Sequence, residues 1–269
     1  MITSSNNAKV KQVVQWQTKA KERRKDHVFL AEGVRMCEEA PVKSVREVYL
    51  TEELEQKLRQ NAQNGDTAFW DKLQQTGYET VSPEVFAKMA DTQTPQGILT
   101  VLEQPSYDLA QLLEQPDPLF LILENLQDPG NLGTMIRTGE GAGITGVIMN
   151  GQTVDIFNPK TIRATMGSIF RVPFVYVPEL SPVLTQMHEK GIHTYAAHLK
   201  GKEYYDSFSF REPTAFLIGN EGNGLTKEIS DQSGQYLKIP MEGKVESLNA
   251  SIAAALLMYE AHRQRSLNS

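Results

Sequence analysis

The sequence has one cysteine, Cys37, among its 269 residues and lacks any long apolar run. A single cysteine excludes an internal disulfide and a cysteine-based metal cluster, and the five histidines have no metal-ligand spacing. The longest apolar stretch, near Ile252 to Tyr259, is too short to span a bilayer. The polar start, residues 1–7, lacks the apolar core of a signal peptide. We therefore expect a cytoplasmic protein without a metal site or a membrane segment.

An overall excess of basic residues is also missing, since the formal net charge is −6. An acidic average disfavours nucleic acid as a partner, but an average conceals local patches. Hydrophobic residues make up 40% of the chain and charged residues 22%, values that are ordinary for a globular protein. The length is sufficient for two domains.

One basic patch does stand out near the start of the chain, where Glu22 is the only acid between residues 9 and 25. This density of cations suits contacts with RNA phosphates. The alternative is a solvated amphipathic helix that buries Val10, Val13 and Val14, and the sequence alone does not decide between the two. The residues that we expect to bind RNA are Lys9, Lys11, Lys21, Arg23, Arg24 and Lys25.

The order of apolar and polar segments predicts two domains. Strands alternate with helices over residues 1–104, which indicates a small α/β domain. Residues 105–116 are polar and flanked by prolines, as in a linker. Over residues 117–269, nearly continuous apolar strands alternate with helices, a pattern typical of a parallel sheet with helices on both faces.

The segment Asp128-Pro-Gly-Asn131 follows the first strand of the second domain and has the composition of a turn. Asn131 is a suitable cap for a helix beginning at Leu132. This purely structural interpretation leaves Arg137 unexplained, because the rest of that helix is small and apolar. Ligand sites in such sheets lie beyond the carboxyl ends of the strands, where this turn is expected.

A second loop, Gly219-Asn-Glu-Gly-Asn-Gly224, also lies between a strand and a helix. It could be taken for a dinucleotide-binding loop, but such loops belong to the first strand–helix unit and have another glycine spacing. Glu221 is either a plain loop carboxylate or a partner for a nearby donor.

The third segment runs from Ile239 to Glu260 and contains a loop followed by a helix that we expect to begin near Ser247. Both Ser247 and Asn249 are good capping residues, although one helix needs only one cap. The apolar residues have helical spacing on one face, and the small residues of 250–255 allow close approach to another backbone. The residues of this face are Leu248, Ile252, Ala255, Leu256 and Tyr259.

Together, and in this order, the three segments resemble the SpoU/TrmH class of RNA 2′-O-ribose methyltransferases (SPOUT). The resemblance implies a C-terminal trefoil knot within the parallel sheet, S-adenosyl-L-methionine as cofactor and a homodimer. More loosely, Phe29 to Gly33 and Thr94 to Gly97 resemble the ribosomal-protein-like, RNA-binding domain that precedes many SpoU catalytic domains.

The resemblance also implies roles for single residues. Arg137 would act in catalysis, and we expect it to stabilise negative charge because a guanidinium stays protonated. Whether it acts in its own site or in that of the partner subunit is open. The full catalytic set is Asn131, Arg137, Glu221, Ser247 and Asn249. The cofactor-binding set is Gly219, Ile239, Met241 and Leu248.

We therefore expect an S-adenosyl-L-methionine-dependent enzyme that methylates a ribose 2′-hydroxyl of RNA. The ribosomal-protein-like first domain favours ribosomal RNA, 23S rRNA in particular, over tRNA. A tRNA 2′-O-methyltransferase and a non-catalytic RNA-binding or ribosome-assembly module are the alternatives. The target nucleotide does not follow from the sequence.

Overall fold

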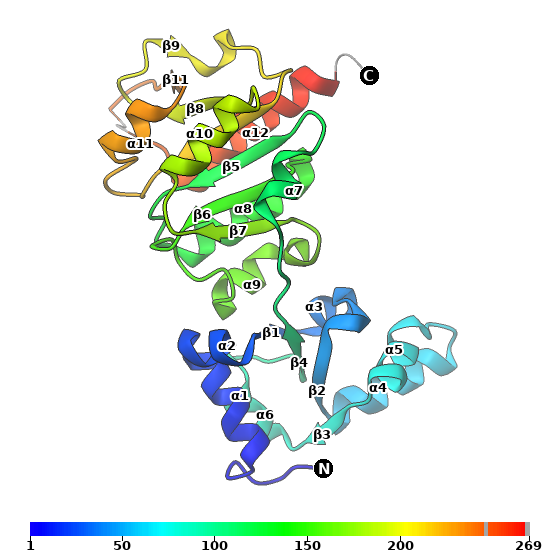
Figure 1. Ribbon diagram of the computed structural model, residues 1–269. Helices are drawn as coiled ribbons and strands as arrows, with labels where there is room; N and C mark the ends of the chain where they lie inside the picture. Colours follow the sequence, from blue (N-terminus) through cyan, green and yellow to red (C-terminus); the bar gives the residue numbers. More distant parts are fainter. Residues whose placement is uncertain (245–246, 267–269) are drawn as a thin grey trace. The chain divides into compact units, whose positions relative to one another are not determined.

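The computed structural model of the chain describes residues 1–244 and 247–266 (Figure 1). It divides into two compact units. The first unit comprises Met1–Pro105 and Asp155–Phe170, and the second comprises Ser106–Val154 and Arg171–Ser269. The segment Asp155–Phe170 therefore packs with the first unit, although it lies within the domain expected at 117–269.

The first unit contains a mixed four-stranded sheet with the order β1-β4-β2-β3. Strand β4 is antiparallel to both of its neighbours, whereas β2 and β3 are parallel. The strands are β1 (Val28–Glu32), β2 (Val45–Thr51), β3 (Glu79–Val81) and β4 (Ile98–Glu103). The helices are α1 (Ala8–Thr18), α2 (Ala20–Asp26), α3 (Val34–Glu39), α4 (Glu52–Gln63), α5 (Ala68–Thr76) and α6 (Pro83–Met89).

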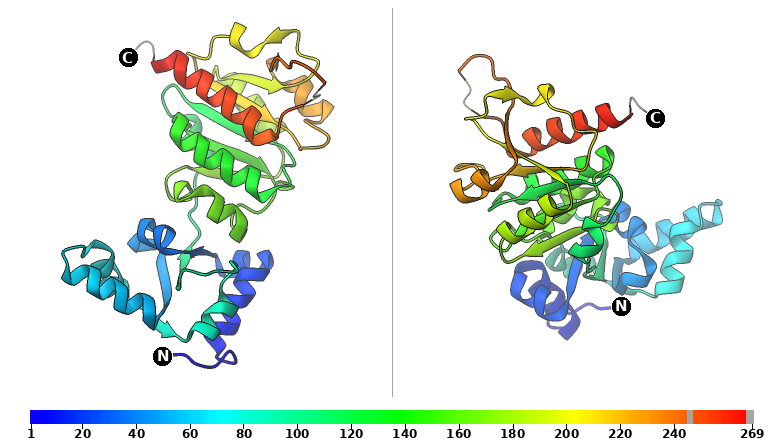
Figure 2. Two further views of the ribbon diagram at one scale, coloured as in Figure 1. Left: turned by 180° about the vertical axis from the view of Figure 1, so that it is seen from behind. Right: turned by 45° about the horizontal axis from the view of Figure 1, so that its top comes forward.

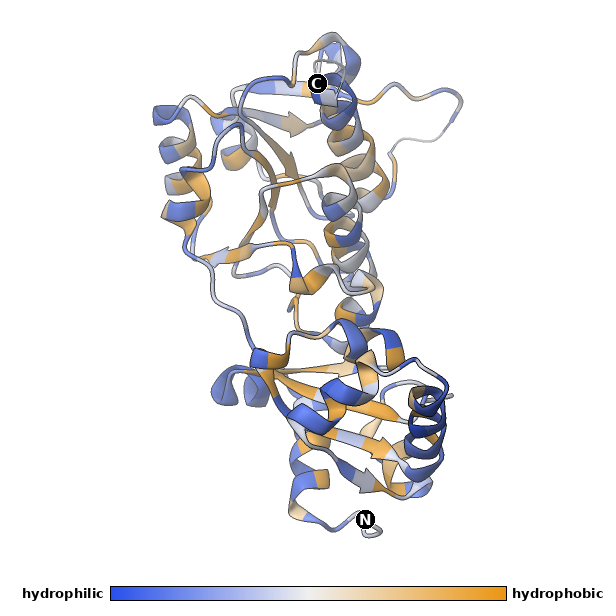
Figure 3. Cartoon of the chain, turned by 90° about the vertical axis from the view of Figure 1, so that its right-hand side faces the viewer, coloured by the Kyte–Doolittle hydropathy of each residue, from blue (hydrophilic) through white to orange (hydrophobic). Residues whose placement is uncertain are grey.

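Helices α1 and α6 cover one apolar cluster of this sheet, and α4 and α5 cover another. In α1, Val10 and Val13 are buried while Lys9 and Lys11 are exposed. Figure 3 shows the same division, with apolar residues along the strands and hydrophilic residues on the helices. Two residues of the predicted stripe are thus buried, whereas Val14 is only half-buried.

The inserted segment Asp155–Phe170 contains α9 (Pro159–Thr165) and completes the first unit. The rings of Phe157 and Phe170 lie 5.0 Å and 6.2 Å from the ring of Phe29 in β1.

The second unit contains a seven-stranded sheet with the order β7-β6-β5-β10-β8-β11-β9 (Figure 1). Every neighbouring pair is parallel, as predicted. The strands are β5 (Leu119–Leu123), β6 (Gly146–Asn150), β7 (Phe174–Val177), β8 (His193–Ala197), β9 (Glu203–Tyr204), β10 (Thr214–Ile218) and β11 (Gln235–Lys238). The C-terminal trefoil knot stays a prediction.

Helices lie on both faces of this sheet, and α8 and α12 run side by side on one of them (Figure 2). The helices of this unit are α7 (Leu109–Leu113), α8 (Pro129–Ala142), α10 (Ser181–Glu189), α11 (Lys227–Gln232) and α12 (Ala250–Ser266). Among the described residues, no helix combines the length and the apolar character needed to cross a membrane.

Helix α12 begins at Ala250 and not at Ser247, and its buried face, which includes Leu257 and Met258, is not the predicted one. Small residues, among them Ala250, Ala254 and Ala261, are buried, so α12 lies close against α8. Three of the larger apolar residues of the predicted face are instead exposed by 50%, 37% and 49%, namely Ile252, Leu256 and Tyr259. We call these three residues the α12 stripe.

Candidate functional site

The candidate site lies where the strand order in the sheet of the second unit reverses, between β5 and β10. From β5 the chain adds β6 and β7 on one side, and β10 and β8 lie on the other. The loops after β5 and β10 therefore leave the same edge of the sheet on either side of this point. Open parallel sheets bind their ligands in such a crevice, beyond the carboxyl ends of the strands.

The loop after β5 leads directly into α8. Asp128 is the N-cap, because its Oδ1 accepts a hydrogen bond from the Asn131 amide at 2.8 Å, and Pro129 occupies the first turn. The expectation that Asn131 caps this helix is therefore wrong. Proline at the first helical position costs no hydrogen bond, which explains why the helix starts two residues before Asn131.

Because Asp128 is the cap, the side chain of Asn131 is free to bridge two other elements. Its Nδ2 donates to Glu221 Oε1 at 3.0 Å, and its Oδ1 accepts from Asn249 Nδ2 at 2.9 Å. Asn249 in turn caps α12 through Oδ1, which accepts from the Ser251 amide at 2.9 Å. Three residues of the predicted catalytic set are thus joined directly.

Glu221 lies in the loop after β10 and accepts hydrogen bonds from the loop after β5. Its Oε1 accepts from the Asp128 amide at 2.9 Å, and its Oε2 accepts from the Gln127 amide at 3.0 Å. Burial alone would raise the pKa of Glu221. The hydrogen bonds from Asn131 and from the two amides outweigh burial, so the pKa lies below its ordinary value. Glu221 is therefore an ionised carboxylate at neutral pH and not a plain loop residue.

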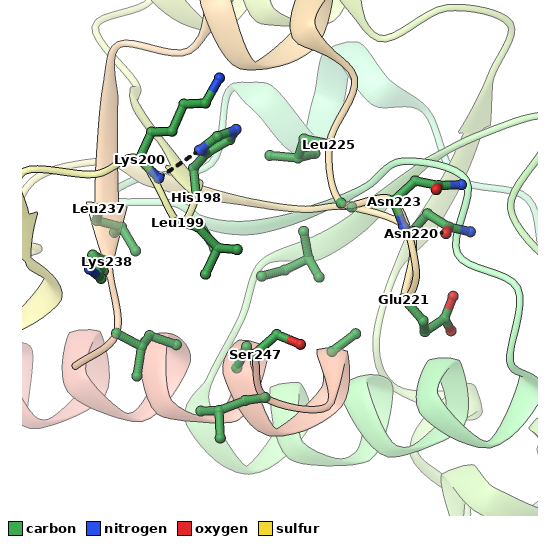
Figure 4. A pocket seen from close by; sticks show the side chains of 18 of the residues that line it. His198, Leu199, Lys200, Asn220, Glu221, Asn223, Leu225, Leu237, Lys238 and Ser247 are labelled. Atoms are coloured by element: carbon green, nitrogen blue, oxygen red, sulfur yellow. Dashed lines mark hydrogen bonds between the residues drawn. The ribbon is translucent and has the colours of Figure 1, made fainter. Parts of the chain in front are cut away.

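A cavity of about 440 Å³ adjoins this network (Figure 4). It lies at the ends of β8, β10 and β11, and its volume falls within the range of small-molecule sites. Leu199, Leu225 and Leu237 contribute apolar wall. The predicted site residues that line the cavity are Gly219, Glu221, Ile239, Met241, Ser247 and Leu248.

Gly219 is required by the shape of its own loop. A Cβ at this position would lie 2.1 Å from the carbonyl carbon of Gly224 and from the Leu225 nitrogen. The loop folds back here, because Asn220 and Gly224 exchange two backbone hydrogen bonds. The resulting backbone cradle beside apolar walls suits an adenosyl group. The glycine itself is required by the fold of its own loop.

His198 lies at the far end of the cavity from Glu221 (Figure 4). Its ring stacks on Tyr236, with the centroids 4.9 Å apart, and its Nδ1 accepts from the Lys200 amide at 3.0 Å. Burial lowers the pKa of His198, and the charge of Lys200 lowers it further. The ring is therefore neutral near pH 7 and acts as part of the wall.

Arg137 does not join the network of Asn131, Glu221 and Asn249. It is exposed on α8, and no hydrogen bond or ion pair links it to a residue within 1–244 or 247–266. Its helix face adjoins the α12 stripe, since a Cβ on Gly141, one turn further on, would lie 2.9 Å from Tyr259 Oη. Arg137 thus lies on the surface that α8 shares with α12.

The predicted RNA-binding residues separate into two groups. Lys9, an exposed residue, is paired with Glu79. Arg23 is buried: it donates to the Trp16 carbonyl at 2.6 Å and to Asp155 Oδ2 at 2.6 Å. Its guanidinium binds partners inside the first unit, so the prediction that Arg23 binds RNA is wrong. The predicted residues on the surface are Lys9, Lys11, Lys21, Arg24 and Lys25.

Three residues of the site escaped sequence reasoning, namely Asn125, Asn150 and Asn220. Asn220 Nδ2 donates to the Asn125 carbonyl at 2.9 Å, and Asn150 Nδ2 donates to Asn125 Oδ1 at 2.7 Å. A usable signal was present, because Asn150 ends its strand and the other two follow theirs within two residues. Within the described residues, no group of histidine, cysteine or acidic side chains has a geometry suited to a metal ion.

Two family models cover most of the chain. The SpoU rRNA Methylase family matches residues 118–259, and the MRM3-like substrate binding domain matches residues 7–100. The chain belongs to the SpoU rRNA methylase family. This result confirms the family predicted from the three motifs, and with it a substrate-binding type of first domain.

Relatives in the SpoU family are 23S rRNA 2′-O-methyltransferases. The 23S rRNA (guanosine(2553)-2′-O)-methyltransferase RlmP of Bacillus subtilis is 34% identical over 261 residues, which cover 96% of this chain and 97% of RlmP. The 23S rRNA (uridine(2479)-2′-O)-methyltransferase of Streptomyces viridochromogenes is 31% identical over 191 residues, covering 69% of this chain and 67% of that protein.

Solved structures of the SpoU family extend the likeness to the cofactor. The AdoMet-bound rRNA methyltransferase of Sinorhizobium meliloti has a TM-score of 0.84 at 29% identity and covers 97% of both chains. The AviRb methyltransferase of Streptomyces viridochromogenes, in complex with AdoMet, has a TM-score of 0.82 at 28% identity and covers 97% of this chain and 99% of its own.

Proposed function

We propose that the chain transfers a methyl group from S-adenosyl-L-methionine to a ribose 2′-hydroxyl of 23S rRNA. The observation that carries the proposal is the hydrogen-bonded network of Asn131, Glu221 and Asn249. This network lies beside the cavity, where the strand order of the sheet reverses. The printed activities of the relatives support the choice of substrate.

The cavity would hold the adenosyl group between the cradle at Gly219 and the segment that carries Ile239, Met241 and Leu248. When bound, the cofactor supplies an electrophilic methyl group on a sulfonium sulfur. In the transfer, the 2′-oxygen would form a bond to the methyl carbon as the sulfur–carbon bond breaks, and the hydroxyl proton would leave to solvent.

The amides Asn131 and Asn249, together with the Ser247 hydroxyl, would orient the ribose. Each amide is already fixed by another residue, Asn131 by Glu221 and Asn249 by the N-terminus of α12. Groups that are fixed before the substrate binds require little reorganisation during the reaction. Glu221 therefore acts on the substrate indirectly, through Asn131.

Arg137 would stabilise the negative charge that develops on the 2′-oxygen. Its exposed place beside the α12 stripe suits a site completed by a second copy of the chain. We propose that the α12 stripe is the homodimer contact, so that Arg137 serves the site of the partner subunit. Leu256→Glu should then yield monomers in sedimentation, whereas Val42→Glu, at another exposed apolar position, should leave the dimer intact. A Leu256→Glu dimer would contradict this contact.

The exposed cations of α1 and α2 would hold the RNA backbone, and the protein would act in the cytoplasm. A tRNA substrate and a non-catalytic RNA-binding module remain the alternatives. Against the module, a mere RNA binder has no need for a network that fixes Asn131 and Asn249 beside a cofactor-sized cavity.

The test is ribose-methylation mapping of total RNA from cells with and without the gene, followed by in vitro methylation with the purified protein. Loss of one 2′-O-methyl mark in 23S rRNA, restored by the purified protein and S-adenosyl-L-methionine, is the expected result. Loss of a tRNA mark would support the first alternative. An unchanged methylation map, with no thermal shift on adding the cofactor, would support the binding module.

A further inference from the structure

Asn125, two residues after β5, has an unusual backbone conformation. Its φ is 57°, in the left-handed region that residues other than glycine rarely adopt. Such a conformation is disfavoured by its own energy and persists where the surroundings hold it in place. Gln127 and Asp128, two and three residues further along, carry the two backbone amides that bind Glu221. The conformation at Asn125 therefore decides where these amides point.

Asn150, the last residue of β6, forms two hydrogen bonds with Asn125 from one side. Its Oδ1 accepts from the Asn125 amide at 3.0 Å, and its Nδ2 donates to Asn125 Oδ1 at 2.7 Å. A third bond, from Thr153 Oγ1 to Asn150 Oδ1 at 2.9 Å, fixes Asn150 itself. One side chain thus holds both the backbone and the side chain of Asn125.

From the other side, the Asn125 carbonyl accepts two hydrogen bonds. They come from Asn220 Nδ2 at 2.9 Å and from Gln127 Nε2 at 3.0 Å. Asn220 also orders the loop that carries Glu221, because its Oδ1 accepts from the Gly222 amide at 2.9 Å. The turn at Asn125 is consequently linked to both loops that fix Glu221.

We propose that Asn150 is a positioning residue for the methyl transfer: it holds Asn125 in its left-handed conformation, directs the amides of Gln127 and Asp128 at Glu221, and thereby fixes Asn131. This inference rests on the proposed function for its catalytic part. Within residues 1–244 and 247–266, Asn150 neither lines the cavity nor makes a hydrogen bond to a residue of the predicted catalytic set.

Asn150→Ala should lower kcat by roughly 10-fold to 100-fold, because misplacing a reacting group by about 1 Å can cost on the order of 10²-fold. KM for RNA and the Kd for S-adenosyl-L-methionine should stay within about twofold, since the variant removes no contact with either. Asn150→Asp keeps the hydrogen-bond acceptor and loses the donor, so its kcat should lie between those of the wild type and Asn150→Ala. Gln152→Ala is the matched control, because Gln152 contributes only its backbone carbonyl, which accepts from Gln127 Nε2.

Rescue separates positioning from a general loss of structure. Glycine adopts positive φ at little cost. Asn125→Gly combined with Asn150→Ala should therefore recover most of the lost kcat, although the double variant has fewer hydrogen bonds than either single one. A double variant as slow as Asn150→Ala would overturn the proposal, and so would an Asn150→Ala protein with the kcat of the wild type.

A measurement that needs no activity covers the case in which the proposed function fails. Hydrogen exchange of a peptide spanning residues 124–131 reports on the amides of Gln127 and Asp128. We expect faster exchange in Asn150→Ala and recovery in the double variant, with Gln152→Ala unchanged. Unchanged exchange in Asn150→Ala would refute the role of Asn150. A wild type that methylates no RNA would refute only the proposed function.

Discussion

Charged residues in the first unit lie mainly on helix surfaces, whereas polar residues of the second unit converge on the ends of parallel strands. In α1 and α2, exposed cations surround one buried arginine, Arg23. In the second unit the pattern is reversed, because the site residues are fixed by their neighbours while Arg137 is exposed. Arginine thus stabilises the fold in the first unit and, as we propose, takes part in catalysis in the second.

The largest effect should come from Arg23→Ala, which leaves Asp155 without its ion-pair partner. Side chains of this pair are 4% and 17% exposed, and removing one member of a buried pair costs about 3–5 kcal/mol. Urea unfolding followed by tryptophan fluorescence reports on this unit, because Trp16 and Trp70 both lie in it. Arg24→Ala, at an exposed neighbour, should change the stability by less than about 0.5 kcal/mol. Equal stabilities for the two variants would break the contrast.

Arg137→Ala should show the opposite behaviour, with normal stability and slow methyl transfer. Loss of one charge-stabilising donor corresponds to about 2.7–4 kcal/mol in the activation free energy. Arg137→Lys should recover little, because an ammonium does not reproduce the planar guanidinium. Single-turnover methylation is the measurement, and Arg211→Ala, at another exposed arginine of the second unit, is the control. A normal rate for Arg137→Ala would remove this arginine from the mechanism.

Reversing the charge of Lys21, Arg24 and Lys25 to glutamate should weaken RNA binding and leave cofactor binding unchanged. The slope of log affinity against log salt should become shallower by about two, at roughly 0.7 for each lost phosphate contact. The matched control reverses three other exposed lysines of the same unit, Lys43, Lys57 and Lys88. If both triple variants lose the same affinity, α1 and α2 form only a solvated surface.

The smallest effect concerns Glu221, whose pKa is lowered by hydrogen bonds and whose side chain is partly solvated. A lowered pKa stabilises the fold above the ordinary value of about 4.3, and this contribution is lost as the pH falls through the folded-state pKa. The stability difference between wild type and Glu221→Gln should therefore be constant from about pH 6 to about pH 8 and shrink below about pH 4.3. Urea unfolding across this range checks it, and a constant difference at all pH values would contradict it.

Local signals in the sequence indicate where many elements begin and end, because capping residues and apolar periodicity act over a few positions. Ser82 with Pro83 at the start of α6 and Gly143 at the end of α8 are examples. The burial of Arg23 was not predictable in this way, since its partner Asp155 lies 132 residues further along the chain.

Partial success at the site has the same origin. Asn131, Glu221 and Asn249 were selected through family resemblance, yet the bonds that join them span 90 and 118 positions. The orientation of α12 was missed for a different reason. Hydropathy favours burial of Leu256, but close packing on α8 favours burial of the small Ala254.

Asp155–Phe170 also affects how this protein can be cut and recombined. The chain passes between the two units at three places, after residues 105, 154 and 170. A fragment that starts at residue 106 would carry Phe157 and Phe170 without the Phe29 ring against which they pack. We therefore expect a chimera with the first unit of a relative to fold stably only when this inserted segment is exchanged as well, although 49 residues separate the two pieces.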